Sequence, residues 1–196
     1  LGRAKCAPTV FGCQAPDTGN AEILAHYGTL AQKARYLEPL LNNEICSCYS
    51  MTEPQGGADP KVFTCVAEAS GDEWIINGEK WFSSNARYAS FLIVMAVTDI
   101  DAPAYQRMSM FIVPSDTPGI EIIRNVAVGY ERAGAHAYIR YTNVRIPRDH
   151  MLGEPGQGFI VAQTRLGGGR IHHAMRTVAK VKRAFDMTCE RALSRT

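Results

Sequence analysis

The sequence predicts an α+β fold in which a block of antiparallel strands, forming a barrel or sandwich, lies between two helical stretches. Apolar residues recur at helical spacing near both ends, whereas the middle consists of short apolar runs separated by turn residues. These runs follow one another without intervening helices, and no Rossmann glycine fingerprint is present. A doubly wound parallel sheet is therefore excluded.

The composition is that of an ordinary globular protein. The chain has 196 residues, of which 46% are hydrophobic and 20% charged, and a formal net charge of +2. This small charge favours no anionic partner, so we expect no nucleic-acid binding. No apolar run approaches the roughly 18 residues that cross a bilayer, and residues 1–9 lack a signal-peptide hydrophobic region.

The cysteines and histidines do not predict a metal site. The six cysteines lack the paired two-residue spacing of a zinc site, and Cys46 and Cys48 are expected on one face of a strand as small core residues. His172 and His173 are adjacent, so they cannot share one helical face. A reducing compartment is the better interpretation.

The first part of the chain predicts a loop followed by two helices. Residues 1–19 are rich in Pro, Gly and small residues, and Asn20 can cap a helix at 21–27. Thr29 and Gln32 form a capping box for a second helix, which Pro39 should kink or end. Its apolar stripe comprises Leu30, Ala34, Leu37 and Leu41.

The middle predicts strands, at residues 45–51, 62–69, 73–77, 79–84, 91–98, 108–114, 120–126 and 136–144. Asn77-Gly78 lies between two aromatic-rich runs and predicts a hairpin turn. Gly71-Asp72 and Pro118-Gly119 mark further reversals.

The last part returns to helix. Residues 159–195 are expected to be helical apart from the three glycines at 167–169. The helical apolar seam comprises Ile171, Met175, Val178, Phe185 and Cys189. Three parts are expected: 1–46, 47–152 and 153–196.

The most informative stretch is residues 48–59, CYSMTEPQGGAD. A strand ends there in Thr-Glu-Pro, and Gly56-Gly57 is expected to leave backbone N–H groups free for a flat, anionic ligand. The pattern alone is unspecific, because many strand-to-loop transitions contain Pro and Gly and bind nothing.

Several motifs together resemble the flavin-binding core of the acyl-CoA dehydrogenases. They are YSMTEP at 49–54, NGEKWFSSNA at 77–86 and GGGR at 167–170, in order along nearly the whole chain. FGCQAPDTGN at 11–20 and GRIHH at 169–173 are similar to the branch containing family members ten and eleven. The resemblance implies the end of an N-terminal helical domain, a middle β domain and the first helix of a C-terminal helical domain.

The resemblance also implies an FAD site. Tyr49, Met51 and Thr52 would lie along the flavin, Trp81 beside its ring and Ser83 near its N5 atom. The implied FAD-binding residues are Tyr49, Met51, Thr52, Gly57, Ala58, Trp81, Ser83 and Arg195, the last reaching a neighbouring subunit. The ordinary alternatives are a strand-end threonine at Thr52 and a core or hairpin aromatic at Trp81.

For the substrate, the resemblance implies acyl-CoA binding by Ala58, Gly169 and Arg170. Ala58 stands where most relatives have a serine, so one hydroxyl contact worth about 1 kcal/mol is lost. The catalytic base, a Glu or Asp, is expected beyond Thr196.

The implied reaction is FAD-dependent dehydrogenation of an acyl-CoA to a 2,3-enoyl-CoA, with electrons passed to an electron-transfer flavoprotein. The implied assembly is a homodimer or homotetramer, cytoplasmic in bacteria and mitochondrial or peroxisomal in eukaryotes. A non-catalytic assembly or binding module and an acyl-CoA oxidase that uses oxygen are the alternatives. The basic face of the last helix, which includes Arg165, Lys182 and Arg183, is more typical of a solvated surface than of a nucleic-acid site.

Overall fold

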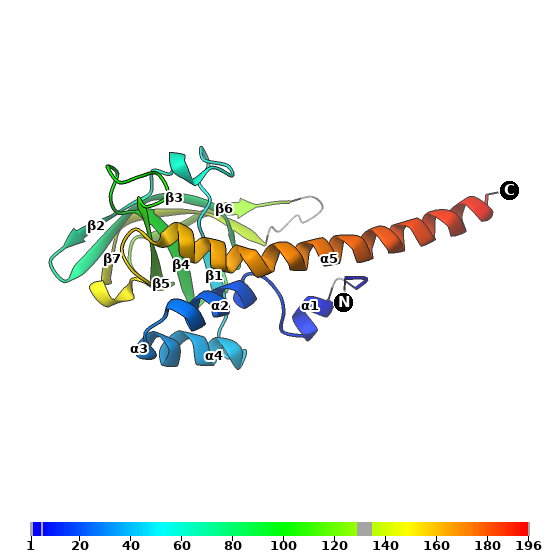
Figure 1. Ribbon diagram of the computed structural model, residues 1–196, viewed down its shortest axis with the longest axis horizontal. Helices are drawn as coiled ribbons and strands as arrows, with labels where there is room; N and C mark the ends of the chain where they lie inside the picture. The colour runs from blue at the N-terminus through cyan, green and yellow to red at the C-terminus, as the bar shows by residue number, and fades with distance from the viewer. Residues whose placement is uncertain (1, 5, 129–134, 196) are drawn as a thin grey trace.

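The computed structural model describes residues 2–4, 6–128 and 135–195. A sheet forms the body, short helices lie along one side of it, and one long helix runs past the sheet and extends beyond it (Figure 1). The α+β class predicted from the sequence is confirmed. Among the described residues, no helix has the length and apolar character needed to cross a membrane.

The helices before the sheet differ from the prediction in their starts and in their buried face. The expected loop contains α1 (Ala7–Val10), and α2 (Asp17–Tyr27) begins four residues before the predicted start. Asn20 is therefore not a cap: it is buried within α2, and its side-chain amide donates to Ser47 Oγ over 2.8 Å. Helix formation starts earlier because Pro16 can occupy the helix entrance, where its missing N–H costs no helical hydrogen bond.

The next helical segment confirms the Thr29–Gln32 capping box but buries another stripe. It comprises α3 (Leu30–Gln32), a π-helical turn η1 (Lys33–Leu37) and α4 (Glu38–Leu41), where Pro39 lies in the first turn. Leu30 and Leu41, predicted to be buried, are exposed, and Tyr36 and Leu40 pack into the core instead. The wider π-helical turn changes the rotation per residue, so a stripe counted at a period of 3.6 fails there.

Within the described residues the strands form one mixed sheet of seven, in the order β1-β4-β2-β3-β7-β6, with β5 paired to β4. Their bounds are β1 Ser47–Ser50, β2 Val66–Ser70, β3 Glu73–Ser84, β4 Phe91–Val97, β5 Met108–Pro114, β6 Ile120–Val126 and β7 His136–Pro147. The sheet is mainly antiparallel, but β1 runs parallel to β4, with Tyr49 opposite Ile93. β2 also pairs with β4 in parallel, so the expectation of an all-antiparallel arrangement is wrong where β1 and β2 meet β4.

The predicted hairpin at Asn77-Gly78 is wrong, because β3 passes straight through these residues. Gly78 has a φ of +142°, and a Cβ there would lie 2.6 Å from the Cα of Cys65. The register of β3 with β7 shifts between Ile76 and Gly78, so Gly78 marks a bulge in β3 and a close approach to Cys65. The hairpin of β2 and β3 turns at Gly71-Asp72, as predicted.

Strand β4 separates two hydrophobic cores. All seven of its residues are buried, and alternate side chains enter opposite cores because successive strand residues point to opposite faces. Leu92, Val94 and Ala96 pack between the strands, whereas Phe91, Ile93 and Met95 pack towards the helices. Both faces of β4 are therefore covered, and its neighbour β1 leads directly into the Thr-Glu-Pro turn.

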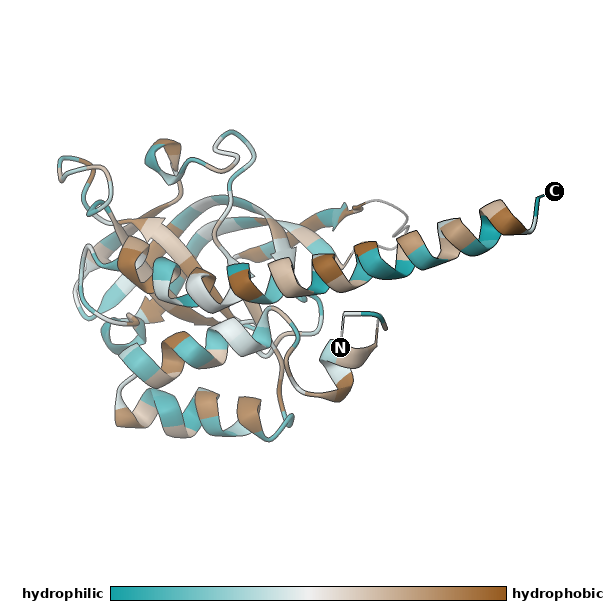
Figure 2. Cartoon of the chain, turned by 45° about the vertical axis from the view of Figure 1, so that its right-hand side comes forward, coloured by the Kyte–Doolittle hydropathy of each residue, from teal (hydrophilic) through white to brown (hydrophobic). Residues whose placement is uncertain are grey.

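The last helix, α5 (Gly158–Leu193), has 36 residues and continues through Gly167–Gly169, where the sequence predicted a break. Only its beginning is buried, at Gly158, Val161 and Ala162. The predicted seam, including Ile171, Met175 and Phe185, is exposed among the described residues. Figure 2 shows apolar and polar residues alternating along this extended helix.

Candidate functional site

A pocket of ≈ 360 Å³ lies at the C-terminal end of β1, and several predicted FAD-binding residues line it together. Tyr49, Met51 and Thr52 come from β1 and its end, and Gly57 and Ala58 come from the following turn. The rest of the lining consists of Phe82 and Ser84 of β3, Arg165 and Leu166 of α5, and Ala15, Pro16 and Phe63. Two separate chain segments thus form two walls of one pocket: a loop wall at 51–58 and a strand wall at 82–84.

The two walls are joined directly. The backbone N–H of Trp81 donates to the carbonyl of Thr52 over 2.9 Å. Tyr49 of β1 also pairs with Ser84 of β3 in the sheet register. Thr52 and Trp81 therefore lie side by side, as the predicted site requires.

A buried ion pair supports the loop wall from behind. Lys80 Nζ lies 2.8 Å from Glu53 Oε1, and both side chains are almost completely buried. Lys80 Nζ also donates to the carbonyl of Met51 over 2.8 Å and lies 4.4 Å from the Phe63 ring centroid. One ammonium group thus fixes both the end of β1 and the glutamate of the Thr-Glu-Pro motif.

Glu53 is satisfied at both carboxylate oxygens. Its Oε1 accepts from the Cys65 N–H over 3.0 Å, and its Oε2 accepts from the Thr64 N–H over 2.6 Å and from Gln55 Nε2 over 2.5 Å. Burial raises the pKa of the carboxyl group, but the Lys80 charge and these hydrogen bonds outweigh it and hold the pKa below its ordinary value. Glu53 is therefore an ionised structural anchor.

The glycine turn differs from the expectation. The N–H groups of Gly56 and Gly57 both approach the carbonyl of Glu53, at 3.1 and 3.4 Å, so they close the turn and are not free for a ligand. A Cβ at Gly56 would lie 2.8 Å from the Phe63 ring, which explains the glycine there. Gly57 has a φ of +53°, a left-handed conformation that favours glycine.

On the strand wall, the structure places different side chains at the pocket from those the sequence indicated. Ser83 is buried, and its hydroxyl lies 3.0 Å from Ser50 Oγ, which in turn lies 2.8 Å from Tyr141 Oη. Phe82 and Ser84 line the pocket instead. The reason is a register shift between Lys80 and Ser83, with Phe82 at a φ of +53°, which interrupts the simple alternation of strand side chains.

Trp81 lies beside the pocket and does not line it. Its ring centroid is 4.8 Å from that of Phe82 and 6.5 Å from that of Tyr138. Its indole N–H is buried and has no acceptor among the described residues. A buried donor without a partner is costly, so this N–H is a candidate contact for a ligand.

Arg165 is a pocket residue that the sequence indicated only as part of a basic helix. Its guanidinium lies 3.7 Å from the Tyr49 ring centroid, and its Nε donates to Asn20 Oδ1 over 2.8 Å. Burial lowers the pKa of Arg165, and the same burial raises the pKa of the Tyr49 phenol to about 12. The available signal was its position four residues after Val161, on the buried helix face.

The predicted substrate residues lie in an adjacent cavity of ≈ 490 Å³. Gly169 and Arg170 line it with Cys13, Glu22 and the two histidines at 172 and 173, and Arg165 borders both cavities. Ala58 lines the first pocket and not this one. Among the described residues, no group of three or more His, Cys, Asp or Glu is placed to hold a metal ion.

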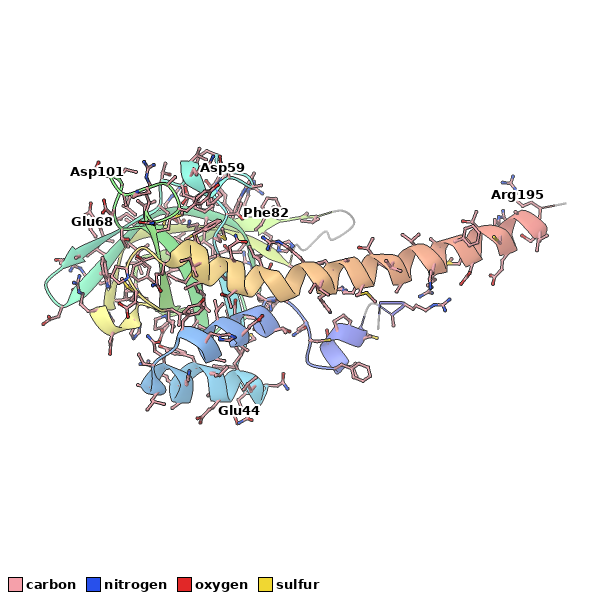
Figure 3. All side chains as sticks on the ribbon, in the orientation of Figure 1. Glu44, Asp59, Glu68, Phe82, Asp101 and Arg195 are labelled. Carbon is pink, nitrogen blue, oxygen red and sulfur yellow. The ribbon has the colours of Figure 1, made fainter. Side chains whose placement is uncertain are left out.

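Arg195 is far from the pocket in this chain. Figure 3 labels it at the tip of α5 and Phe82 near the sheet. α5 continues from Arg165 to Leu193 before the chain reaches Arg195, and this stretch of helix is about 40 Å long at 1.5 Å per residue. Arg195 cannot contribute to this pocket, and its predicted role at a neighbouring subunit stays a prediction.

Comparisons with known proteins agree with this geometry. Residues 48–144 match the model of the acyl-CoA dehydrogenase middle domain. The chain is 45% identical to acyl-CoA dehydrogenase family member 11 of Gallus gallus, over 99% of this chain and 26% of that protein. It is 43% identical to family member 10 of Mus musculus, over 100% of this chain and 19% of that protein.

A solved structure gives the same result. A Mycobacterium abscessus protein described as a candidate acyl-CoA dehydrogenase matches with a TM-score of 0.93 and 44% identity, over 100% of this chain and 49% of that one. The chain thus spans less than half the length of each of these three proteins. The resemblance to members ten and eleven is confirmed, and the chain belongs to the acyl-CoA dehydrogenase family, a family of oxidoreductases.

Proposed function

We propose that the whole protein binds FAD with its flavin ring in the pocket between the loop wall and the strand wall. The observation that carries this proposal is the Trp81 N–H to Thr52 carbonyl hydrogen bond, which joins the two walls into one pocket. Its volume of ≈ 360 Å³ lies at the low end of the roughly 300–1,000 Å³ range of ligand pockets and suits a ring system more than a whole dinucleotide.

The lining fits a flat ring that carries hydrogen-bonding atoms along its edges. Phe82 offers an aromatic face, and Thr52 and Ser84 offer hydroxyl groups from two different segments. Trp81 does not line the pocket, but its ring packs against that of Phe82. Arg165, ordered by Tyr49 and Asn20, places a positive charge at the pocket, where it would stabilise negative charge on a reduced ring.

The proposed reaction is dehydrogenation of an acyl-CoA thioester to a 2,3-enoyl-CoA. FAD, when bound, accepts the hydride that leaves the β carbon. The residues of this chain bind and orient: the Glu53–Lys80 pair holds Met51 and Thr52 in place, and the strand wall holds Phe82 and Ser84. The carboxylate that removes the α proton is expected after Thr196, as the family resemblance implies.

Substrate binding is proposed for the cavity next to the pocket. Gly169 and Arg170 line that cavity, and Arg165 lies between the two spaces. Arg170 is exposed, and its NH2 group donates to Gln163 over 2.9 Å, so it is available to a polar part of a thioester substrate. An electron-transfer flavoprotein is the proposed electron acceptor.

The test is anaerobic titration of the purified whole protein with acyl-CoAs of different chain lengths. We expect flavin absorption bands in the purified protein and bleaching of those bands by at least one acyl-CoA. Reoxidation by an electron-transfer flavoprotein, without release of hydrogen peroxide in air, supports a dehydrogenase. A protein that takes up no FAD contradicts the proposal, and one that holds FAD but is bleached by no acyl-CoA supports a non-catalytic module.

A further inference from the structure

A single histidine contacts both strand-wall residues that line the pocket. His136, at the start of β7, pairs with Ser84 in the sheet register, and its Nδ1 lies 2.8 Å from Ser84 Oγ. Its ring centroid is also 6.0 Å from that of Phe82, in an edge-to-face arrangement. His136 is half-buried and does not line the pocket, so it acts on the pocket through these two residues.

We propose that His136 is a positioning residue that decides whether the Ser84 hydroxyl donates or accepts a hydrogen bond with the cofactor. This inference rests on the proposed FAD site. A serine hydroxyl has one hydrogen to donate and two lone pairs that accept. Because either the hydrogen or one lone pair is used in the hydrogen bond to His136 Nδ1, the imidazole decides whether Ser84 offers its hydrogen or only lone pairs to the pocket.

The two possible states of the imidazole give opposite results. When Nδ1 carries no hydrogen, Ser84 donates to His136 and presents lone pairs to the pocket. When Nδ1 carries a hydrogen, His136 donates to Ser84, and the serine hydrogen is available to the pocket. A flavin ring gains N–H donors on reduction, so this choice favours one redox state of the cofactor over the other.

The surroundings of His136 keep this pair in place. Its backbone neighbour Ala135 accepts from the Asn85 N–H over 3.0 Å, which aligns the ends of β3 and β7. On the other side, His136 pairs with Val126 of β6. The small space beside it is also lined by Arg87 and Tyr88, and the Arg87 Nε donates to Asn125 Oδ1 over 2.5 Å.

The test is a double-mutant cycle on the whole protein, with FAD dissociation constant and flavin midpoint potential as the two measurements. The variants are Ser84→Ala, His136→Leu and the double variant, where leucine keeps bulk against Phe82 but forms no hydrogen bond. We expect each single change to weaken FAD binding about fivefold, as for loss of one net hydrogen bond, and to shift the potential in the same direction. The double variant should match Ser84→Ala, because His136 acts through that hydroxyl.

Two further variants make the result specific. His136→Asn keeps a hydrogen-bonding atom near the position of Nδ1 and should restore most of the affinity and potential. His26→Asn changes an exposed histidine on α2 and should behave like the unchanged protein. Thermal unfolding of each apoprotein identifies any variant whose effect comes from lost folding.

The outcomes separate this inference from the proposed function. An unchanged protein that binds no FAD contradicts both. An unchanged protein that binds FAD, together with a His136→Leu variant of the same affinity and potential, contradicts the role of His136 alone. Additive effects in the double variant also contradict it, because they show that His136 does not act through Ser84.

Discussion

The two walls of the pocket are held in place by different physical means. The loop wall is supported by a fully buried ion pair, in which Lys80 and Glu53 have side-chain exposures of 0% and 1%. The strand wall is supported by a half-buried hydrogen bond between Ser84 and His136. Breaking a buried charge pair is far more costly than losing one partly buried hydrogen bond. The comparison therefore indicates a rigid wall that sets the shape of the pocket and a softer wall that adjusts its chemistry.

The largest effect is expected from Lys80→Met. This change leaves the Glu53 carboxylate buried without its cation, so we expect a loss of about 3–5 kcal/mol in the free energy of unfolding. Urea unfolding of the protein measures it. Arg145→Met is the matched control, because Arg145 and Glu73 form a pair in the same sheet with exposed side chains, and exposed pairs contribute about 0–1 kcal/mol. Equal losses in the two variants would show that the buried pair has no special role.

Acid should weaken the loop wall selectively. The folded-state pKa of Glu53 lies below its ordinary value of 4.5, so its contribution to stability is fully present above that value and is lost as the pH falls through the folded-state pKa. We therefore expect the stability difference between the unchanged protein and Glu53→Gln to shrink as the pH falls below 4.5. Urea unfolding over a pH series measures this difference. Glu68→Gln controls for the loss of a carboxylate elsewhere in the sheet. A difference that stays constant into strong acid would contradict the assignment.

The comparison also shows how far the sequence could predict the site. The family resemblance indicated Tyr49, Met51 and Thr52, and all three line the pocket, while their contact with FAD stays a prediction. On the strand wall the resemblance indicated Trp81 and Ser83, whereas Phe82 and Ser84 line the pocket, since the register shift before Ser83 interrupts the alternation of strand side chains. Long-range partners were also missed, because nothing local indicates that Arg165 lies over Tyr49.

The fold shows the same limit. Strand positions such as β5 and β6 were predicted at their observed bounds from alternating or continuous apolar runs. The Asn77-Gly78 motif predicted a turn, yet the close approach of Cys65 makes Gly78 a bulge in a continuous strand. Local turn chemistry is a valid signal, but here packing across the sheet outweighs it.

Ser83→Ala distinguishes the two readings of the strand wall. The Ser83 hydroxyl is part of a buried hydrogen-bonded chain with those of Ser50 and Tyr141. Removing this hydroxyl should reduce the free energy of unfolding by about 1 kcal/mol and leave FAD affinity unchanged. Ser84→Ala should do the opposite, weakening FAD binding with little effect on folding. Denaturant unfolding and FAD titration of both variants measure the two quantities. A Ser83→Ala variant that binds FAD more weakly than Ser84→Ala would restore the sequence-based assignment.

The smallest effect concerns α5, which contributes Arg165 and Leu166 to the lining of the pocket. Gly167 is helical, and a Cβ there would meet nothing within 4 Å. Replacement by alanine removes the conformational freedom of glycine in the unfolded chain, so Gly167→Ala should stabilise the protein by about 0.5–1 kcal/mol. Gly158→Ala is the contrasting variant, because its Cβ would lie 2.8 Å from the Met108 carbonyl oxygen and should destabilise the protein. Amide hydrogen exchange along α5 should slow around Gly167 in the first variant. A destabilised Gly167→Ala protein would show that the helix needs a flexible point beside the pocket, as the predicted break at 167–169 suggested.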